Sequence, residues 1–251
     1  MSKLKGKVAV VTGGARDIGR AVSIKLASEG AMVVVNYFDS VDDANETVSQ
    51  IKNAGGEAIA AYADVTKKAD IDAMVAQTIE AFGNQVDILI NVAGGLFARK
   101  TIEEMDENFY DLLMSVNFKS VFLVTQAFKP YLVSGSAIVN FASQAARDGG
   151  GPGASMYAAS KGAVMTYTRS LAKEFGPQGI RVNALNPGMI ATRFHDDFTK
   201  EQVRINVAAG TALRREGKAE EVANVVSYLV SDEASFLTGN NIDINGGLAF
   251  S

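Results

Sequence analysis

A glycine-rich stretch, VVTGGARDIGRAV at residues 10–22, constrains the fold more than any other feature of this chain. It begins with apolar β-branched residues that suit a buried strand, and it ends with residues that suit a helix. Glycines at such a corner allow a tight turn and a close backbone approach, while the N–H groups of the helix point at a phosphate. The stretch therefore predicts a nucleotide-binding strand–turn–helix unit, and a plain turn between a strand and a helix is the alternative.

Short apolar runs alternate with amphipathic helical stretches along the rest of the chain, and most of the runs are continuous, as in strands covered on both faces. The expected strands are Lys7–Val11, Met32–Asn36, Ala58–Tyr62, Asp87–Asn91, Ala137–Asn140, Ile180–Leu185 and Asn241–Ile244. The expected helices are Gly19–Ser28, Val41–Asn53, Asp70–Phe82, Asn108–Tyr131, Ser155–Phe175 and Ala219–Val230. This alternation predicts an α/β fold, a doubly wound Rossmann-type domain whose seven-stranded parallel sheet carries helices on both faces.

We expect residues 1–251 to form one domain, because the chain shows no proline-rich linker, no break in composition and no internal repeat. The longest segment without a strand–helix repeat is 186–218, after the sixth expected strand. Segments beyond the carboxyl ends of parallel strands build the ligand site of such sheets. We therefore interpret residues 186–218, which include a short helical pattern, as a substrate lid.

The composition excludes several classes of function. The formal net charge is −4 and the basic residues are scattered, so we expect no nucleic-acid partner. There is no cysteine, no apolar run long enough to span a membrane, and no apolar segment typical of a signal peptide in the opening MSKLKGKVAV. These features predict a cytoplasmic protein that has no membrane partner and needs no metal or disulfide for its stability.

The end of the second expected strand, VVVNYFDS at residues 33–40, bears on the choice of cofactor. An acidic residue there favours NAD(H) by bonding the ribose 2′-hydroxyl, whereas basic surroundings accommodate the 2′-phosphate of NADP(H). The position expected to hold the acid is Tyr37, while Arg16 lies in the adjacent loop and Ser40 is nearby. These residues favour NADP(H). Asp39 favours NAD(H) if its side chain turns inward, and an ordinary polar turn is the remaining interpretation.

A second group of residues carries acid–base chemistry. Tyr157 and Lys161 are four residues apart on an expected helix, so they share a face, and a nearby ammonium favours the phenolate. Such a pair acts as a general acid or base on an alcohol or a ketone, although an exposed helix face is the plainer interpretation. Ser143 follows the fifth expected strand and Asn91 ends the fourth, which places both at the same edge as the glycine loop.

Taken together, these motifs resemble the classical short-chain dehydrogenase/reductase family over nearly the whole chain, from Gly6 to Gly247. TGGARDIG resembles its cofactor loop, ADVT its adenine-contacting stretch and NVAG its fourth-strand motif. SVNFKS, FASQ and YAASK resemble the motifs that carry its catalytic asparagine, serine, tyrosine and lysine, and NPGMIAT resembles the turn that holds the nicotinamide.

The resemblance implies the roles of the site residues. Tyr157 exchanges a proton with the substrate oxygen, Lys161 lowers the pKa of that tyrosine and binds the ribose, Ser143 polarises the carbonyl, and Asn117 holds a water of the proton relay. The family uses no catalytic metal. The residues expected to bind the cofactor are Gly13, Arg16, Asp17, Ile18, Gly19, Asn36, Tyr37, Ser40, Asp64, Val65, Asn91, Ala93, Gly94, Tyr157, Lys161, Pro187, Gly188, Ile190 and Thr192.

Two positions depart from the family pattern. Asp17 stands where the loop usually has its middle glycine, and Val92 stands where the fourth-strand motif commonly has asparagine. An acid at position 17 suits the positive end of a helix dipole but repels a diphosphate. We expect the Asp17 side chain to leave the pocket while the backbone still binds phosphate. The change at Val92 is mild because Asn91 is retained.

The substrate is less constrained than the cofactor. Leu96, Phe97, Gln144, Met189 and Phe194 are the expected pocket walls. Arg99, Arg147 and Arg193 follow the strand ends, where an anionic substrate is one interpretation of their charge, and solvated loop charges are the favoured one. His195 is interpreted as a solvated side chain with no assigned role.

The favoured function is an NADP(H)-dependent reductase of carbonyl or sugar-type substrates. The alternatives are a 3-oxoacyl-[acyl-carrier-protein] reductase, an NAD-dependent alcohol or sugar dehydrogenase, and a non-catalytic NADP-binding regulator. The carrier-protein reductases share the VVVNY and TGNNIDINGG patterns, but they place basic residues where this chain has LVSGSA and GPQG. The resemblance also implies a homotetramer, with Asn108–Tyr131 and Ser155–Phe175 at its main interface.

Overall fold

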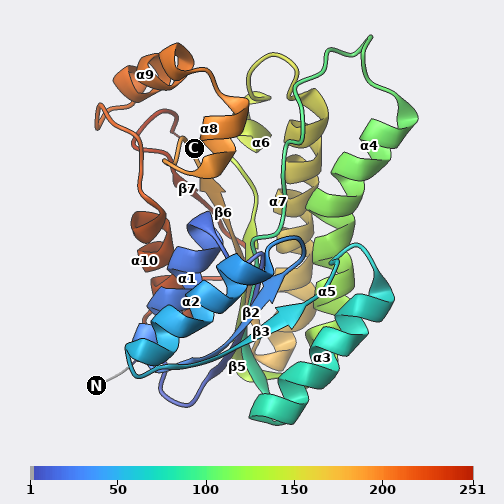
Figure 1. Cartoon of the computed structure of the whole chain (residues 1–251), viewed down its shortest axis with the longest axis vertical. Helices are drawn as coiled ribbons and strands as arrows, with labels where there is room; N and C mark the ends of the chain where they lie inside the picture. Colours follow the sequence, from blue (N-terminus) through green and yellow to red (C-terminus); the bar gives the residue numbers. More distant parts are fainter. Residues whose placement is uncertain (1–2, 251) are drawn as a thin grey trace.

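Seven parallel strands form the central sheet of the computed structural model, which describes residues 3–250 (Figure 1). Their order is β3-β2-β1-β4-β5-β6-β7, and every pair is parallel. The strands are β1 (Val8–Thr12), β2 (Met32–Tyr37), β3 (Glu57–Tyr62), β4 (Val86–Asn91), β5 (Leu132–Phe141), β6 (Arg181–Pro187) and β7 (Asn241–Ile244). This order confirms the predicted Rossmann-type fold. Its direction reverses between β1 and β4, and the ligand crevice of such sheets lies at this reversal.

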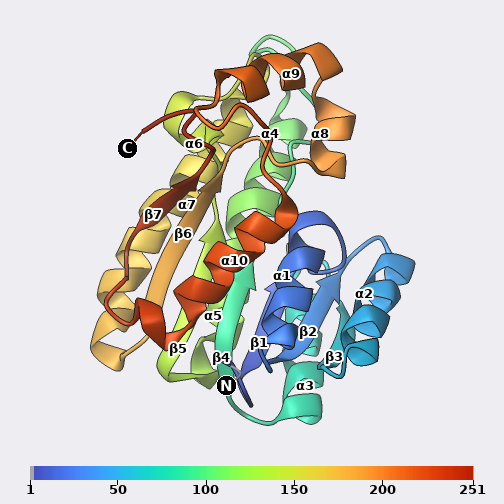
Figure 2. The same ribbon diagram turned by 90° about the vertical axis from the view of Figure 1, so that its left-hand side faces the viewer.

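Helices cover both faces of the sheet, as predicted. One face is packed by α1 (Asp17–Ser28), α2 (Val41–Asn53) and α10 (Ala219–Val230), which lie in front of the sheet in Figure 2. The other face is packed by α3 (Lys68–Phe82), α5 (Ser120–Phe128) and α7 (Ser155–Phe175). No helix within residues 3–250 is both long enough and apolar enough to cross a membrane.

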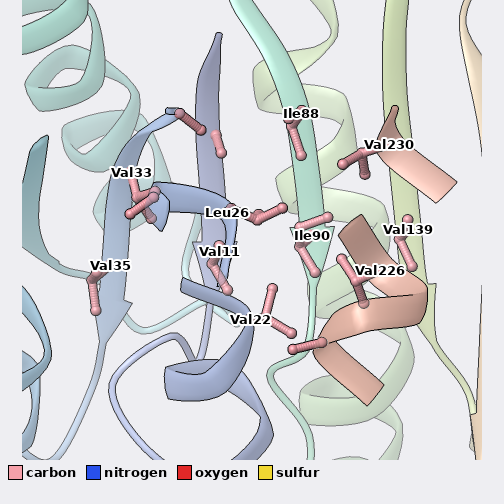
Figure 3. Packing of buried hydrophobic residues seen from close by; sticks show 14 of the residues in the cluster. Val11, Val22, Leu26, Val33, Val35, Ile88, Ile90, Val139, Val226 and Val230 are labelled. Atoms are coloured by element: carbon pink, nitrogen blue, oxygen red, sulfur yellow. The ribbon is translucent and has the colours of Figure 1, made fainter. Parts of the chain in front are cut away.

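The strands alternate between two apolar cores, one on each face of the sheet. In β1, Val11 packs into the core beneath α1 and α10, while its neighbour Val10 packs into the core beneath α5 and α7. Figure 3 shows Leu26 of α1 and Val226 of α10 over Ile90 of β4. Full burial of such a side chain stabilises the fold by about 1.5–3 kcal/mol, which explains why the strands read as continuous apolar runs.

One expected helix is interrupted. The segment predicted as a single helix, residues 108–131, contains α4 (Glu107–Met114), a π-helical turn (Ser115–Lys119) and α5 (Ser120–Phe128). The turn carries Asn117, whose side-chain amide bonds the backbone of Gly95. No glycine or proline marks this break in the sequence, so the single-helix prediction was wrong in this detail. π-Turns inside α-helices occur frequently at functional sites.

The segment interpreted as a lid holds two helices, α8 (Arg193–Phe198) and α9 (Glu201–Gly210), which lie beyond the carboxyl ends of the strands (Figures 1 and 2). A further short helix, α6 (Ala145–Asp148), follows β5 at the same edge. The observed strand bounds agree with the predicted ones within two residues, except that β5 begins at Leu132 and not at Ala137. Polar residues and Gly135 in this first half of β5 conceal the strand pattern in the sequence.

Candidate active site

A cavity of about 760 Å³ opens at the carboxyl edge of the sheet. Its walls come from the segments that follow each of the seven strands, including the one that holds α8 and α9, and from α7. Every residue that the sequence predicts for the site lines this cavity except Asp64, Asn91 and Asn117. Residues far apart in the chain therefore meet in one hollow, as the motif analysis expects.

The glycine loop forms a backbone surface at one end of the cavity. A Cβ added to Gly19 would lie 1.9 Å from the carbonyl oxygen of Gly13, so the loop and the start of α1 pack backbone against backbone. Arg16 occupies the N-cap position of α1. Its side chain makes no capping hydrogen bond to the helix in the described part of the chain. The N–H groups of the first turn are therefore available to an anion. This loop fits the diphosphate of a dinucleotide.

Asp17 turns from this loop toward α8. Its backbone φ is +50°, a conformation that favours glycine, and its Oδ1 accepts a hydrogen bond of 3.1 Å from the N–H of Arg193. Arg193 is the first residue of α8. The carboxylate therefore caps α8 rather than its own helix. The hydrogen-bond partner explains how the loop tolerates an acid.

The end of β2 brings charged and aromatic side chains to the far end of the cavity. Arg16 Nη2 lies 3.6 Å from Asp39 Oδ2, and both side chains are largely exposed. The hydroxyl of Ser40 accepts from the N–H of Asp43 at 3.4 Å, which makes Ser40 the N-cap of α2, and it donates to Asp43 Oδ2 at 2.7 Å. Asn36 holds the glycine loop in place, because its Oδ1 accepts from the N–H of Gly13 at 3.1 Å.

Tyr157 and Lys161 lie one turn apart on α7 and line the cavity with Ser143, which follows β5. The Nζ of Lys161 donates to the carbonyl oxygen of Phe141 at 2.8 Å and lies 5.9 Å from the centre of the Tyr157 ring. The lysine is buried, and this carbonyl directs its ammonium toward the carboxyl end of β5. The three side chains that the sequence assigns to acid–base chemistry therefore meet in one wall.

Burial governs the ionisation of this pair. It raises the pKa of Tyr157 above its usual value, and a hydrogen bond with the Ser143 side chain opposes this rise. It lowers the pKa of Lys161 to about 8. The expected lowering of the tyrosine pKa by Lys161 does not appear here, because burial outweighs a charge placed nearly 6 Å from the ring centre.

Asn117 supports the site from behind the cavity wall. Its Oδ1 accepts from the N–H of Gly95 at 2.9 Å, and its Nδ2 donates to the carbonyl oxygen of Gly95 at 2.8 Å. Both ends of the side-chain amide are thereby engaged. A Cβ at Gly94 would lie 2.7 Å from Asn117 Oδ1 and 2.9 Å from Lys161 Nζ, so only glycine fits between these side chains.

The two other residues outside the wall also stabilise backbone. Asn91 is buried, and its Nδ2 donates to Asn140 Oδ1 at 2.8 Å, which links β4 to β5. The Asp64 carboxylate accepts from the N–H and the hydroxyl of Thr66 and shapes the turn after β3.

The substrate side of the cavity is mainly apolar and aromatic. Four of the expected wall residues, Leu96, Phe97, Met189 and Phe194, line it together with Gln144, and Val207 and Leu248 join them. The sequence pointed to neither residue: Val207 is an ordinary apolar residue of α9, and Leu248 directly follows the TGNNIDINGG pattern without belonging to it. The ring of Phe194 in α8 lies 6.1 Å from the ring of Tyr157, centre to centre.

The interpretation of His195 as a solvated side chain was wrong. His195 is half-buried in the cavity wall, and burial together with the charge of Arg204 lowers its pKa to about 4. Its Nδ1 lies 3.1 Å from the hydroxyl of Thr199. The imidazole is therefore neutral at physiological pH and can exchange hydrogen bonds with a bound molecule.

The three arginines read as solvated charges also have partners. Arg147 pairs with Asp243 at 3.1 Å, and Arg193 pairs with Asp43 at 3.4 Å. Arg99 lines the cavity and donates to two carbonyl oxygens, those of Phe198 and Pro152, both at 3.1 Å. Nothing in the local sequence indicates these contacts, because each joins segments that are distant along the chain.

Comparison with known proteins gives consistent matches over the whole chain. The family model described as enoyl-(acyl carrier protein) reductase matches residues 13–249. An uncharacterised oxidoreductase of Methylorubrum extorquens is 38% identical, over 99% of this chain and 100% of that protein. The 3-oxoacyl-[acyl-carrier-protein] reductase of Staphylococcus epidermidis is 36% identical, over 96% of this chain and 98% of the reductase.

Solved structures agree with this chain in fold and in sequence. A short-chain dehydrogenase/reductase from Serratia marcescens has a TM-score of 0.93 and 35% identity, covering 99% of this chain and 100% of its own. A short-chain dehydrogenase from Burkholderia cenocepacia in complex with NADP has a TM-score of 0.90 and 34% identity, covering 98% and 99%. An NADH-dependent reductase of alginate metabolism has a TM-score of 0.91 and 34% identity, covering 100% of both chains.

Proposed function

The chain belongs to the short-chain dehydrogenase/reductase family, and we propose that it is an NADP(H)-dependent reductase of small carbonyl compounds with Tyr157 as its general acid. Members of this family are NAD(P)-dependent oxidoreductases that act on carbonyl and alcohol groups. The observation that carries the finer proposal is the meeting of Ser143, Tyr157 and Lys161 in one cavity wall beside the glycine loop.

In the proposed reaction, each side chain has a role that its surroundings support. The reduced nicotinamide, when bound, supplies the hydride. The Ser143 hydroxyl donates to the carbonyl oxygen and holds it near Tyr157, whose phenol then gives its proton to that oxygen. Burial raises the pKa of Tyr157, so the phenol is protonated at neutral pH but gives up its proton less readily than a free tyrosine. Lys161 supplies positive charge next to the site, which favours the phenolate left behind.

Asn117 acts in this proposal through the backbone. Its side-chain amide is committed to Gly95 on both ends, so a relay water would be held by main-chain groups of the π-turn rather than by the amide. The side chain fixes the loop after β4, and this loop carries Gly94 next to Lys161. Asn117 is therefore a positioning residue for the lysine as well as a relay site.

The proposed preference for NADP(H) rests on Arg16. Its guanidinium lies 3.6 Å from the exposed carboxylate of Asp39, and a 2′-phosphate in this region can replace Asp39 as its partner. Tyr37 offers no carboxylate to a ribose 2′-hydroxyl. Among the solved relatives, one is in complex with NADP and another is named as NADH-dependent, so the family name alone does not decide the preference.

A titration of nicotinamide fluorescence with NADPH and NADH tests this preference. We expect the wild-type chain to bind NADPH at least about tenfold more tightly than NADH, and Arg16→Ala to remove most of that difference. Asp39→Ala is the matched variant, because it removes the competing carboxylate and should strengthen NADPH binding. Tighter binding of NADH by the wild-type chain would contradict the proposal and would favour an NAD-dependent dehydrogenase.

The substrate that the cavity favours is a carbonyl compound with an apolar or aromatic substituent. Leu96, Phe97, Met189 and Phe194 provide apolar walls, while Gln144 and His195 offer neutral polar groups. The experiment is a panel of small ketones and aldehydes assayed by NADPH consumption. Turnover of at least one of them would support the reductase, whereas NADPH binding with no turnover at all would favour a non-catalytic regulator.

A 3-oxoacyl-[acyl-carrier-protein] reductase is the second candidate, because one such enzyme is 36% identical over nearly the whole chain. The carrier-protein reductases place basic residues where this chain has LVSGSA and GPQG, and an acidic carrier protein would be attracted to them. Both segments lack a basic residue here, which is why we place this function second. A higher kcat/KM for an acetoacetyl carrier protein than for its small thioester analogue would make the carrier-protein reductase the favoured function.

We further propose that the protein is a homotetramer. Figure 1 shows α4 and α5 beside α7 along one side of the molecule, and these helices carry exposed apolar side chains at Tyr110, Leu112 and Phe122. Light scattering after gel filtration measures the mass directly. Replacing Leu112 and Phe122 together by serine should dissociate the assembly, and a monomeric wild-type chain would exclude it.

A further inference from the structure

The lid helix α8 is six residues long and lies against the cavity. A helix of this length does not persist by itself, because nucleation costs more than so few hydrogen bonds return. Its first N–H groups and last carbonyls also lack partners inside the helix. The position of α8 must therefore be decided by contacts with the rest of the molecule.

At the start of α8, Asp17 supplies such a contact. Its Oδ1 accepts from the N–H of Arg193 at 3.1 Å, across 176 residues of sequence. Asp17 adopts a φ of +50° in doing so, and aspartate and asparagine are the side-chain-bearing residues that accept this region most readily. The guanidinium of Arg193 also lies 3.4 Å from Asp43, which Ser40 and Arg20 hold in place.

At the end of α8, Arg99 supplies the second contact. Its Nε donates to the carbonyl oxygen of Phe198 at 3.1 Å, and its Nη1 donates to that of Pro152 at the same distance. A cation at a helix C-terminus is favourable. Within residues 3–250 no carboxylate lies within ion-pair distance of Arg99, so these two carbonyl oxygens are the acceptors of its guanidinium there.

Between these two ends, α8 presents an aromatic face to the catalytic tyrosine. The Phe194 ring lies 6.1 Å from the Tyr157 ring and 5.4 Å from the Phe198 ring. The place of Phe194 depends on the two ends of α8, and within the helix Asp196 adds an ion pair with Arg204 of α9. A shift of the helix would move the wall that the substrate must pack against while leaving Ser143, Tyr157 and Lys161 where they are.

We propose that Asp17 and Arg99 are positioning residues that clamp the two ends of α8, so that the substrate wall is set by the glycine loop on one side and by the loop after β4 on the other. The inference rests on the proposed function for its kinetic consequence, but not for the clamp itself. The proposal distinguishes two effects of Asp17. The hydrogen bond of Asp17 holds α8, while the negative charge of Asp17 lies in the loop proposed to bind a diphosphate.

Hydrogen exchange of peptides spanning 192–200, followed by mass spectrometry, tests the clamp without any turnover. We expect exchange in this segment to be at least about tenfold faster in Asp17→Gly and in Arg99→Ala than in the wild type. Asp17→Asn keeps an acceptor oxygen and should stay close to wild type. In Arg99→Lys the ammonium can reach only one of the two carbonyl oxygens. The exchange rate of this variant should therefore lie between those of the wild type and Arg99→Ala. Peptides from α3, which none of these contacts reaches, serve as the folding control and should not change.

Binding and kinetics then separate the two effects of Asp17. Asp17→Asn and Asp17→Gly both lose the charge, so both should bind NADPH about three- to tenfold more tightly. Only Asp17→Gly should also raise the KM for the carbonyl substrate about tenfold, as should Arg99→Ala. A purely structural loss would lower kcat and weaken NADPH binding together.

Unchanged exchange at 192–200 in both Asp17→Gly and Arg99→Ala would overturn the clamp, as would exchange in Asp17→Asn that is as fast as in Asp17→Gly. If the variants behave as expected while no carbonyl compound is reduced by the wild type, the clamp stands and the proposed function fails. Equal NADPH affinity in all Asp17 forms would remove the charge effect and refute the separation of the two roles.

Discussion

At the scale of single residues, the chemistry depends on how burial sets the ionisation of neighbouring groups. Burial raises the pKa of the Tyr157 phenol and lowers that of the Lys161 ammonium to about 8. The two shifts favour the neutral form of each group. A protonated phenol suits a general acid, and a lysine that titrates near neutrality makes the site sensitive to moderately alkaline pH.

Tyr157→Phe removes the proposed proton donor while keeping the ring that packs against Phe194. We expect turnover to fall by about 10²–10⁴-fold, the usual contribution of general acid catalysis. The dissociation constant of NADPH should change by less than about threefold, since one hydroxyl is lost at the edge of its site. Tyr167→Phe, on the same helix but outside the cavity, is the control and should keep its activity.

The pH dependence of carbonyl reduction follows from Lys161. Below its pKa of about 8 the side chain is charged and supports the phenolate that forms on Tyr157. Above that value it loses its proton, while the raised pKa of Tyr157 keeps the phenol protonated. We expect kcat/KM to be level below about pH 8 and to fall at higher pH. A profile that stays level from about pH 7 to about pH 9.5 would exclude this role of the lysine.

At the scale of elements, the lid responds to groups that lie outside its own motif. His195 sits in α8 with its pKa lowered to about 4 by burial and by Arg204, and Arg99, Asp196 and Glu216 also act on it. The folded lid therefore disfavours the charged imidazole. The stability that the neutral histidine contributes is complete above the unfolded value of 6.5 and is lost as the pH falls toward 4.

We therefore expect amide exchange in 192–200, corrected for the intrinsic rate, to accelerate as the pH is lowered from about 6.5 to about 4. His195→Gln retains a neutral polar side chain and should flatten this dependence. Carboxylates such as Glu216 also gain protons at low pH, and the glutamine variant separates their contribution from that of the histidine. An equal acceleration in both proteins would assign the effect to the carboxylates.

At the scale of the whole molecule, two apolar cores on opposite faces of one sheet hold the site together. Leu26 of α1 is completely buried under α10, so the helix that begins at the cofactor loop and the helix that follows the lid are packed on each other. We propose on this ground that residues 1–251 form one cooperative unit, with the lid at 186–218 as a peripheral segment.

Leu26→Ala should lower the free energy of unfolding by about 2–5 kcal/mol, the usual range for a buried leucine. Leu213→Ala, at a position that is 62% exposed, should change it by less than about 0.5 kcal/mol. Urea unfolding followed by circular dichroism and by tyrosine fluorescence measures both at a fixed protein concentration. Two separate transitions in the wild type would show that the chain does not unfold as one unit.

The sequence by itself determined the sheet, the glycine loop and the positions of the acid–base residues. These are local properties: a buried parallel strand needs a continuous apolar run, a tight corner needs glycine, and a tyrosine and a lysine four residues apart share a helix face. Family resemblance then related Asn117, Ser143, Tyr157 and Lys161 to one reaction. The structure places three of them in one cavity wall and the fourth directly behind it.

Only the tertiary structure decided which long-range hydrogen bonds the side chains around the cavity make. Asp17 meets Arg193 across 176 residues, Arg99 reaches Phe198, and Asn117 reaches back to Gly95 from a π-turn that no glycine or proline announces. Each contact joins segments whose distance is set by the packing of the whole sheet and not by their spacing in the chain. The hydrophobic periodicity of a segment indicates which face of its helix or strand a residue occupies. A hydrogen bond between distant segments depends on the relative positions of both in the folded molecule.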